Sequence, residues 1–372
     1  MASPDLSALV REKKVIVCCG AGGVGKTTTS AALALAAARH GRRVLVLTID
    51  PARRLAQAMG IHESMREPTQ VSPERLKDAG VEDGSLDAWM LNPDVVFDKL
   101  VRSMAKTPEQ AERILSSRLF RHLSELVAGM QEYTAAEALY ELSTSGRYDL
   151  VVLDTPPSRN ALDFLEAPGK LARFLDEKIL NLFLPAKQRG LVKRASEFIG
   201  VVFTKVFGAE FFAEIQEFLS AFGGMFGPKR IHAEGVRALL SSDQAAFILV
   251  TSPDQAALTD ARYFRDRIID MGLPFAGFVL NRSWVRTDGF VDPDTLVLPA
   301  GPPAVKTAIA KLAALAKVEL GRVARDRALL RQLASEVPAS AFAVAAPYLG
   351  EAIEDLRGLS VLARGITEAP IR

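Results

Sequence analysis

The sequence is poor in cysteine: its 372 residues include only two, Cys18 and Cys19. These two are adjacent in an apolar run, and the alternation of side chains along a strand points them to opposite faces. In such a strand they cannot form a disulfide with each other. So few cysteines exclude a disulfide framework and the cysteine-rich classes of metal site.

The sequence also lacks a strong charge of either sign and a long apolar run. Its formal net charge is +2, and basic residues lie beside nearly every acidic cluster, which argues against a nucleic-acid surface. No segment offers about 18 uninterrupted apolar residues, and the first residues show no signal-peptide core. We therefore expect a cytoplasmic protein with no nucleic-acid partner and no stable membrane insertion.

What the sequence does contain is a series of short β-rich runs between helical stretches. Continuous apolar strands separated by helices are typical of a parallel sheet that is covered on both faces. We therefore predict an α/β fold with a doubly wound, mostly parallel sheet. Its expected strands are residues 15–19, 44–49, 150–153, 247–251, 278–281 and 342–345.

The chain is longer than most single domains, so insertions are expected. We predict one domain over residues 1–372, with a helical insertion subdomain made of residues 94–145 and 163–240. Neither range is needed to complete a minimal sheet, so specificity should lie there. An Ala-rich helix over residues 27–40, ended by Gly41, is expected after the first strand.

A glycine-rich segment connects the first strand to this helix. It reads Gly20-Ala21-Gly22-Gly23-Val24-Gly25-Lys26-Thr27 and matches the phosphate-binding loop (P-loop) pattern in full. Its glycines let backbone N–H groups turn toward phosphates, and the helix N-terminus adds the positive end of its dipole. Lys26 should reach the terminal phosphates, and Thr27 should offer its hydroxyl to Mg²⁺. We predict that this loop, with Thr28, binds ATP and Mg²⁺.

The same segment also fits a dinucleotide-binding fingerprint, because three of its glycines have that spacing. Asp50 lies about where a ribose-binding acid would follow. However, Lys26, Thr27 and Thr28 come directly after the third glycine. A dinucleotide fold has no use for a cation and two hydroxyls at that place, so the P-loop interpretation is favoured.

Two aspartates complete the predicted site. Asp50 and Asp154 follow the strands at 44–49 and 150–153, and the carboxyl ends of parallel strands are where open α/β sheets bind ligands. Asp154 suits Mg²⁺, directly or through water, and Asp50 suits orienting the attacking water. We therefore predict Lys26 and Asp50 as catalytic residues. A strand-end aspartate can also cap a helix or shape a turn, but a neighbouring P-loop weakens that alternative.

Three strings occur in order along the chain: GAGGVGKTTTSAALA at 20–34, TIDPARRL at 48–55 and DTPPSRNAL at 154–162. Together they resemble the ArsA-like ATPases, a P-loop family that includes the arsenite-pump ATPase and the ATPase that targets tail-anchored proteins. The resemblance is strongest to bacterial proteins known as anion-transporting ATPases. It implies ATP hydrolysis, with the second and third strings acting as nucleotide-sensing switches.

The resemblance implies further residues of the site. Asn281 and Pro347 fall where the family places its adenine contacts. Family membership also implies a dimer, of this chain with itself or with a paralogue, that holds the nucleotide at its interface. The two switches contribute Pro51, Arg53, Arg54, Pro156 and Arg159.

The loop departs from the family at Ala21. There the family has a signature lysine, which reaches the phosphates of the partner subunit. A charge that stabilises phosphoryl transfer can be worth about 10³–10⁵ in rate, so its loss favours a slow enzyme. Alternatively, Arg53, Arg54 or Arg159 supplies the charge, or a lysine-bearing paralogue pairs with this chain. Surface ion pairing is the ordinary role of such arginines.

Metal sites of the family are missing too. Arsenite pumps bind metalloid through several cysteines, and the targeting ATPase holds zinc through a Cys-x-x-Cys pair, whereas the thiols here lie in the first strand. We therefore expect neither arsenite transport nor a zinc-clamped dimer.

Residues 174–226 contain ten of the nineteen phenylalanines. Several apolar residues there recur at helical spacing, so these helices either pack on one another or form a groove for a hydrophobic helix of a client protein or membrane-protein segment. Because of Ala21, an ATP-binding regulatory or scaffolding subunit with little hydrolysis remains an alternative. A chromosome- or division-site-positioning ATPase is disfavoured, since it needs a basic DNA surface or a membrane-binding C-terminal helix.

Overall fold

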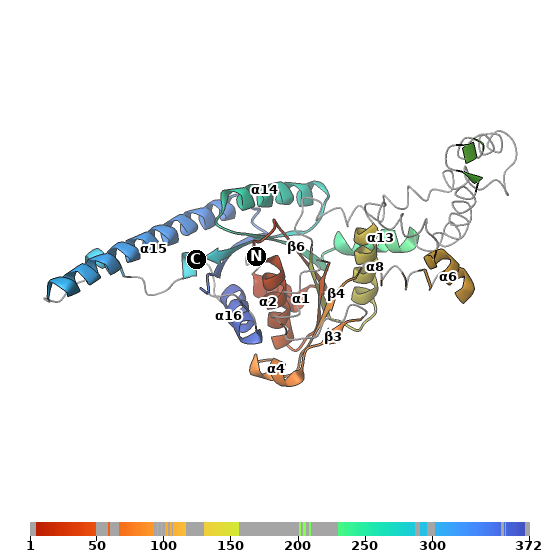
Figure 1. The fold of residues 1–372 in the computed structure, drawn as a ribbon, viewed down its shortest axis with the longest axis horizontal. Coiled ribbons are helices and arrows are strands. Elements are labelled where there is room, and N and C mark those ends of the chain that lie inside the picture. Colours follow the sequence, from red (N-terminus) through yellow and green to blue (C-terminus); the bar gives the residue numbers. More distant parts are fainter. Residues whose placement is uncertain are drawn as a thin grey trace.

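The structure is a computed structural model, and it describes most of the chain (Figure 1). The described segments are residues 5–49, 67–92, 107–116, 130–155, 230–286, 291–295, 302–350 and 355–368, together with residues 59, 95, 98, 101, 102, 105, 201, 204, 205, 208, 209 and 353.

An eight-stranded sheet with the order β3-β4-β2-β5-β1-β6-β7-β8 forms the centre of the described residues. All neighbouring strands are parallel except β3 and β4, which pair antiparallel at one edge. This topology confirms the predicted doubly wound, mostly parallel sheet. The strands are β1 (Val15–Cys19), β2 (Arg43–Thr48), β3 (Thr69–Gln70), β4 (Ser85–Met90), β5 (Leu150–Asp154), β6 (Ala245–Thr251), β7 (Phe275–Ser283) and β8 (Phe342–Pro347).

Two of these strands, β3 and β4, were not expected from the sequence. Strand β4 reads SLDAWM, and its central Asp87 interrupts the apolar run that the prediction required. In the structure Asp87 is buried. Its carboxylate accepts a hydrogen bond from the Tyr148 hydroxyl at 2.6 Å and another from the Arg147 guanidinium at 3.1 Å. A buried carboxylate is tolerated when such partners are present. The partners lie about sixty residues away in sequence, and only the fold brings them to Asp87.

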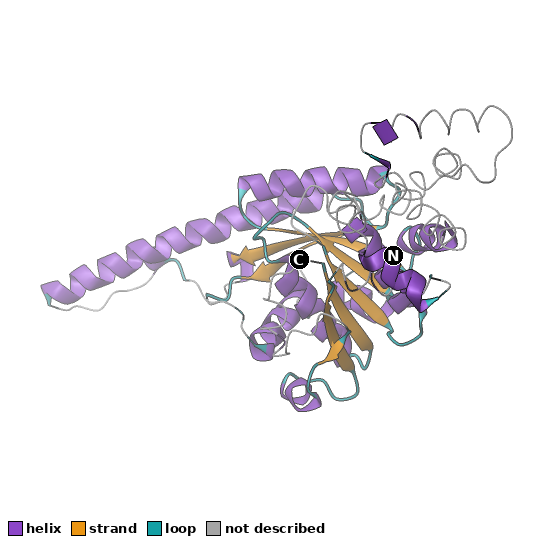
Figure 2. Ribbon diagram, turned by 45° about the vertical axis from the view of Figure 1, so that its right-hand side comes forward, coloured by secondary structure: helices purple, strands orange, loops and turns teal. Residues whose placement is uncertain are grey.

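Helices cover both faces of the sheet (Figures 1 and 2). The first face packs against α1 (Leu6–Glu12), α2 (Lys26–Arg39), α4 (Pro73–Asp78) and α16 (Leu356–Thr367), and the second against α8 (Met130–Thr144), α13 (Arg230–Leu240), α14 (Gln255–Asp270) and α15 (Pro303–Ser335). Strand residues alternate between the two cores: Cys18 belongs to the first and Cys19 to the second, as predicted. Burial raises the pKa of the Cys19 thiol to about 12, so this thiol stays protonated near neutral pH.

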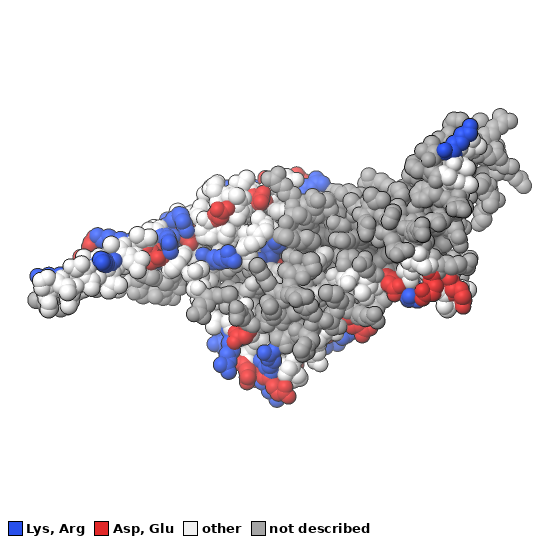
Figure 3. Space-filling model, in the orientation of Figure 1, with Lys and Arg blue, Asp and Glu red and all other residues white. Residues whose placement is uncertain are grey.

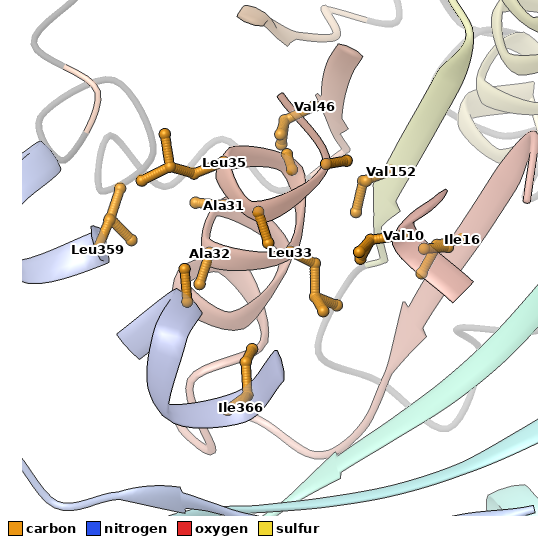
Figure 4. Packing of buried hydrophobic residues seen from close by; sticks show 14 of the residues in the cluster. Val10, Ile16, Ala31, Ala32, Leu33, Leu35, Val46, Val152, Leu359 and Ile366 are labelled. Atoms are coloured by element: carbon orange, nitrogen blue, oxygen red, sulfur yellow. The ribbon is translucent and has the colours of Figure 1, made fainter. Parts of the chain in front are cut away.

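Helix α2 is buried on nearly all sides, and its small side chains explain how it fits. It lies between the sheet and α16, where Ala31, Ala32 and Leu33 face strand residues and α16 residues such as Leu359 and Ile366 (Figure 4). A helix that is apolar all round is expected in such a place. It ends one residue earlier than predicted, at Arg39, and Gly41 follows with a left-handed φ of 76°. Because α2 begins at Lys26 and is buried along its length, the direction of the chain after the P-loop is fixed.

The predicted insertions are described only in part. Their described helices are α6 (Pro108–Ser116), α8 and α13, and both α8 and α13 contribute to the core on the second face. The phenylalanines of residues 174–226 lie outside the described residues.

Helix α15 is 33 residues long and reaches beyond the sheet (Figures 1 and 2). Its C-terminal half packs on the sheet, where buried Asp326 accepts a hydrogen bond from the backbone N–H of Trp284 at 3.0 Å. Its N-terminal half is exposed, and Leu312 and Leu315 keep 65% and 58% of their surface. Despite this length, no helix within the described segments is both long and apolar enough to span a bilayer.

Charged side chains of opposite sign lie near one another on the surface. Figure 3 shows this around α4 and along α15. On and beside α15, Lys317 pairs with Asp294 at 2.8 Å and Arg322 with Glu319 at 2.9 Å. Such exposed pairs add little stability, because water screens them.

Candidate functional site

The carboxyl ends of the parallel strands bring the predicted site residues to one edge of the sheet. The P-loop follows β1, Asp154 is the last residue of β5, and Asn281 lies near the end of β7. Strands β5 and β6 both flank β1, so the loop lies between the ends of its neighbours. This edge is the usual ligand site of open α/β sheets.

Two glycines of the loop sit where no side chain fits. Gly20 has a φ of 152°, and a Cβ there would overlap the carbonyl oxygen of Val250 on β6. Gly25, the N-cap of α2, has a φ of 92°, and a Cβ there would overlap the amide nitrogen of Asn281. Close approach by β6 and β7 thus requires glycine at both positions.

Lys26 is folded over the loop. It is the first residue of α2 and only 6% exposed, and its Nζ donates to the carbonyl oxygen of Ala21 at 2.9 Å. The side chain of Ala21, at the position of the family's signature lysine, is half-buried against the first core. Thr28 is half-buried in the first turn of α2.

Thr27 and Asp154 are brought into direct contact. Asp154 is fully buried, and its Oδ2 accepts a hydrogen bond from the Thr27 hydroxyl at 2.6 Å. The same Oδ2 accepts a second bond, from the Thr48 hydroxyl at 3.0 Å. The carboxylate therefore joins the start of α2 to the end of β2.

Thr48 is a residue that the sequence reasoning missed. It is the last residue of β2, and the register places it opposite Asp154 of β5. The one available signal was a hydroxyl residue that ends the otherwise apolar run VLVLT and begins the first switch string. Without the strand register, nothing connected this hydroxyl to Asp154.

The donor set fits Mg²⁺. A carboxylate and a hydroxyl are hard oxygen ligands, and Mg²⁺ is commonly bound by one or two carboxylates together with substrate phosphates. Thr27 lies in the first turn of α2, where the helix dipole favours an anion. These residues suit a bound phosphate and its metal ion.

Asn281 and Pro347 lie at different distances from the loop along the sheet. The buried amide of Asn281 donates from Nδ2 to the carbonyl oxygen of Val24 at 2.8 Å, so it touches the loop itself. Pro347 ends β8, one strand further out, where the register pairs it with Ser283. The structure therefore brings Asn281 into contact with the P-loop and places Pro347 on the next strand outward.

Six predicted site residues lie outside the described residues: Asp50, Pro51, Arg53, Arg54, Pro156 and Arg159. The residues that lead into each switch are described, up to Ile49 for the first and up to Thr155 for the second. Ile49 donates its backbone N–H to the carbonyl oxygen of Asp154 at 3.3 Å, and the Thr155 hydroxyl donates to that of Cys18 at 2.9 Å. Both switches therefore leave the sheet directly beside Asp154.

Comparison with known proteins places this site within a described family. A family model described as "Anion-transporting ATPase" matches residues 13–287. That range contains the P-loop, both aspartates and Asn281.

Several curated proteins are similar to part of the chain. The uncharacterized protein SCO2128 of Streptomyces coelicolor is 32% identical over 163 residues, which are 44% of this chain and 39% of that protein. ATPase ASNA1 homolog 1 of Paramecium tetraurelia is 31% identical over 163 residues, 43% of this chain and 45% of its own length. ATPase GET3 of Malassezia globosa is 31% identical over 174 residues, which are 46% of this chain and 48% of that protein. The chain thus spans less than half of each of these relatives.

A glycine pair tests the geometry of the loop. We expect Gly25→Ala to weaken binding of a fluorescent ATP analogue at least about tenfold, because the new Cβ adds strain at positive φ and overlaps Asn281. Gly41→Ala is the matched control: its φ is also positive, but no atom lies within 4 Å of the added Cβ. Equal affinities of the two variants would show that the loop geometry does not govern binding.

Proposed function

The chain belongs to the anion-transporting ATPase family, and on this basis we propose that it binds ATP with Mg²⁺ at residues 20–27 and hydrolyses it. The observation that carries the proposal is the hydrogen bond between Thr27 and Asp154, 2.6 Å long, at the N-terminus of the helix that follows the P-loop. It joins a hydroxyl and a carboxylate, both of which are oxygen ligands for Mg²⁺.

Each residue has a distinct role in this proposal. Lys26 turns from the Ala21 carbonyl to the β and γ phosphates and neutralises their charge. Thr27 and Asp154 hold Mg²⁺, which when bound offsets the charge of the phosphate oxygens. Asp50 orients the attacking water, a role supported by its place two residues beyond Thr48, which contacts Asp154. Asn281 and Pro347 contact the adenine.

The proposed enzyme works as a dimer, with this chain or a paralogue as its partner. The resemblance to ArsA-like ATPases supports the dimer. Ala21, whose half-buried side chain has no charge, stands at the signature position, so another group must supply the positive charge. We assign that charge to the arginines of the switches or to a lysine-bearing partner. Such a charge is worth about 10³–10⁵ in rate, so the dimer is the catalytic unit where the partner supplies it.

Ala21 also favours a second candidate function. A subunit that binds ATP but barely hydrolyses it would keep every phosphate contact of the loop and lack only the signature charge. Such a subunit would regulate or scaffold an active paralogue. ATP binding is common to both candidates, so turnover by the pure chain separates them.

Turnover of purified protein is the test. We expect ATP hydrolysis whose specific rate rises with protein concentration, and we expect Asp50→Asn to lower it at least about 100-fold while ATP binding persists. Asp149→Asn is a control with the same chemical change: Asp149 pairs with Arg43 at the opposite end of β5 and should leave turnover unchanged. ATP binding without turnover would support the regulatory subunit instead. Failure of the pure chain to bind ATP would contradict both candidates.

We further propose that the cycle moves helices to bind a hydrophobic client protein. Two features support this proposal. One is the set of ArsA-like motifs, and the other is the ten phenylalanines of residues 174–226. An apolar surface rich in phenylalanine typically marks a site where another apolar segment binds. A client segment would be an apolar helix laid into a groove.

Trapped protein tests the client. We expect Asp50→Asn protein, purified with ATP from its own cell, to carry proteins with an apolar helix of about 20 residues. Lys26→Ala protein, which should not hold ATP, serves as the background. If repeated trials enrich no such protein over this background, the client proposal is wrong.

A further inference from the structure

Thr48 is not used by any role assigned above, yet its hydroxyl touches the centre of the site. Its side chain is buried, with 1% of its surface exposed, and Oγ1 donates to Asp154 Oδ2 at 3.0 Å. We infer that Thr48 is a positioning residue that holds the Asp154 carboxylate ready for the metal ion. This inference rests on the proposed Mg²⁺–ATP function.

Two hydroxyls from different elements meet at one carboxylate oxygen. Thr27 approaches from the start of α2 at 2.6 Å, and Thr48 from the end of β2 at 3.0 Å. The backbone adds a third link, because the N–H of Ile49 donates to the Asp154 carbonyl at 3.3 Å. A carboxylate held at both its side chain and its backbone has one orientation before any ligand arrives. Hydrogen bonds to an ionised carboxylate are also stronger than neutral ones.

The two hydroxyls have different relations to the proposed metal ion. The oxygen of Thr27 is a proposed ligand of Mg²⁺, so its hydrogen bond to Asp154 must adapt when the ion binds. Thr48 lies on β2, and the register that places it opposite Asp154 belongs to the central sheet. Thr48 can therefore hold the carboxylate both with and without the ion. Partners of this kind typically change metal affinity by about 10–100-fold when removed.

Thr48 also stands at the start of the first switch. Asp50, the proposed water-orienting residue, is two residues further along the chain. The hydrogen bond from Thr48 therefore connects the proposed metal ligand to the chain segment that leads into Asp50. In this way one hydroxyl joins the metal ligand to the first switch.

The competing explanation is that Thr48 merely satisfies its own hydroxyl in the core. Thr251 provides a matched control for it. This residue is fully buried at the end of β6, two strands away from β5, and its hydroxyl has no hydrogen-bond partner in the part of the chain that the structure describes. A Thr→Val change at 251 removes a buried hydroxyl at the same edge without touching Asp154.

The experiment measures how much Mg²⁺ strengthens nucleotide binding. The affinity for a non-hydrolysable fluorescent ATP analogue is determined with Mg²⁺ and with EDTA, and the ratio gives the contribution of the metal. We expect Thr48→Val and Thr48→Ala to lower this ratio about 10–100-fold, while affinity in EDTA is unchanged. Thr48→Ser keeps the hydroxyl and should restore the ratio, and Thr251→Val should match the unmodified protein.

The outcomes separate this inference from the proposed function. If the unmodified protein binds the analogue equally with and without Mg²⁺, the Mg²⁺ proposal fails, and the inference with it. If the unmodified protein shows the metal effect but Thr48→Ala shows it undiminished, only the inference is overturned. The same holds if Thr48→Ser loses the effect as fully as Thr48→Ala, because the hydroxyl would then not be the cause.

Discussion

The buried carboxylate of Asp154 is the constraint on which the rest of the site depends. An ionised carboxylate removed from water is costly unless hydrogen bonds replace its hydration. Thr27 and Thr48 supply such bonds, and they come from α2 and β2, the two elements that lead from the P-loop and into the first switch. The carboxylate can stay buried only while these elements keep their places. The fold and the candidate metal site are therefore stabilised by the same contacts.

The parallel sheet explains why these groups meet. Strand β1 lies between β5 and β6, so the loop that follows it emerges beside both Asp154 and the carbonyl of Val250. Strand β7 adds Asn281, whose amide holds the loop at Val24. Small side chains on α2 then allow the helix to pack closely between the sheet and α16. The P-loop is thus confined on several sides by groups that are distant in sequence.

The apolar runs between helical stretches were enough to predict the sheet class. Motif spacing was enough to predict the loop and its neighbouring aspartate, because glycine, lysine and strand-end carboxylates carry their chemistry in the local sequence. Both kinds of reasoning missed features that depend on partners elsewhere in the chain. Strand β4 was missed because Asp87 looks unsuited to a core until Tyr148 supplies its hydrogen bond. Thr48 was missed because only the register of β2 and β5 sets it opposite Asp154. The long exposed part of α15 was missed because its extent beyond the sheet is a property of the packed fold.

The most direct measurement is a crystal structure of this chain with Mg²⁺ and a non-hydrolysable ATP analogue. We expect Mg²⁺ to be bound by Thr27 and Asp154, with Thr48 still bonded to Asp154. Lys26 should contact a phosphate oxygen in place of the Ala21 carbonyl oxygen, which lies 2.9 Å from its Nζ. Phosphates bound away from the loop, or a metal ion that neither Thr27 nor Asp154 approaches, would contradict the proposed site.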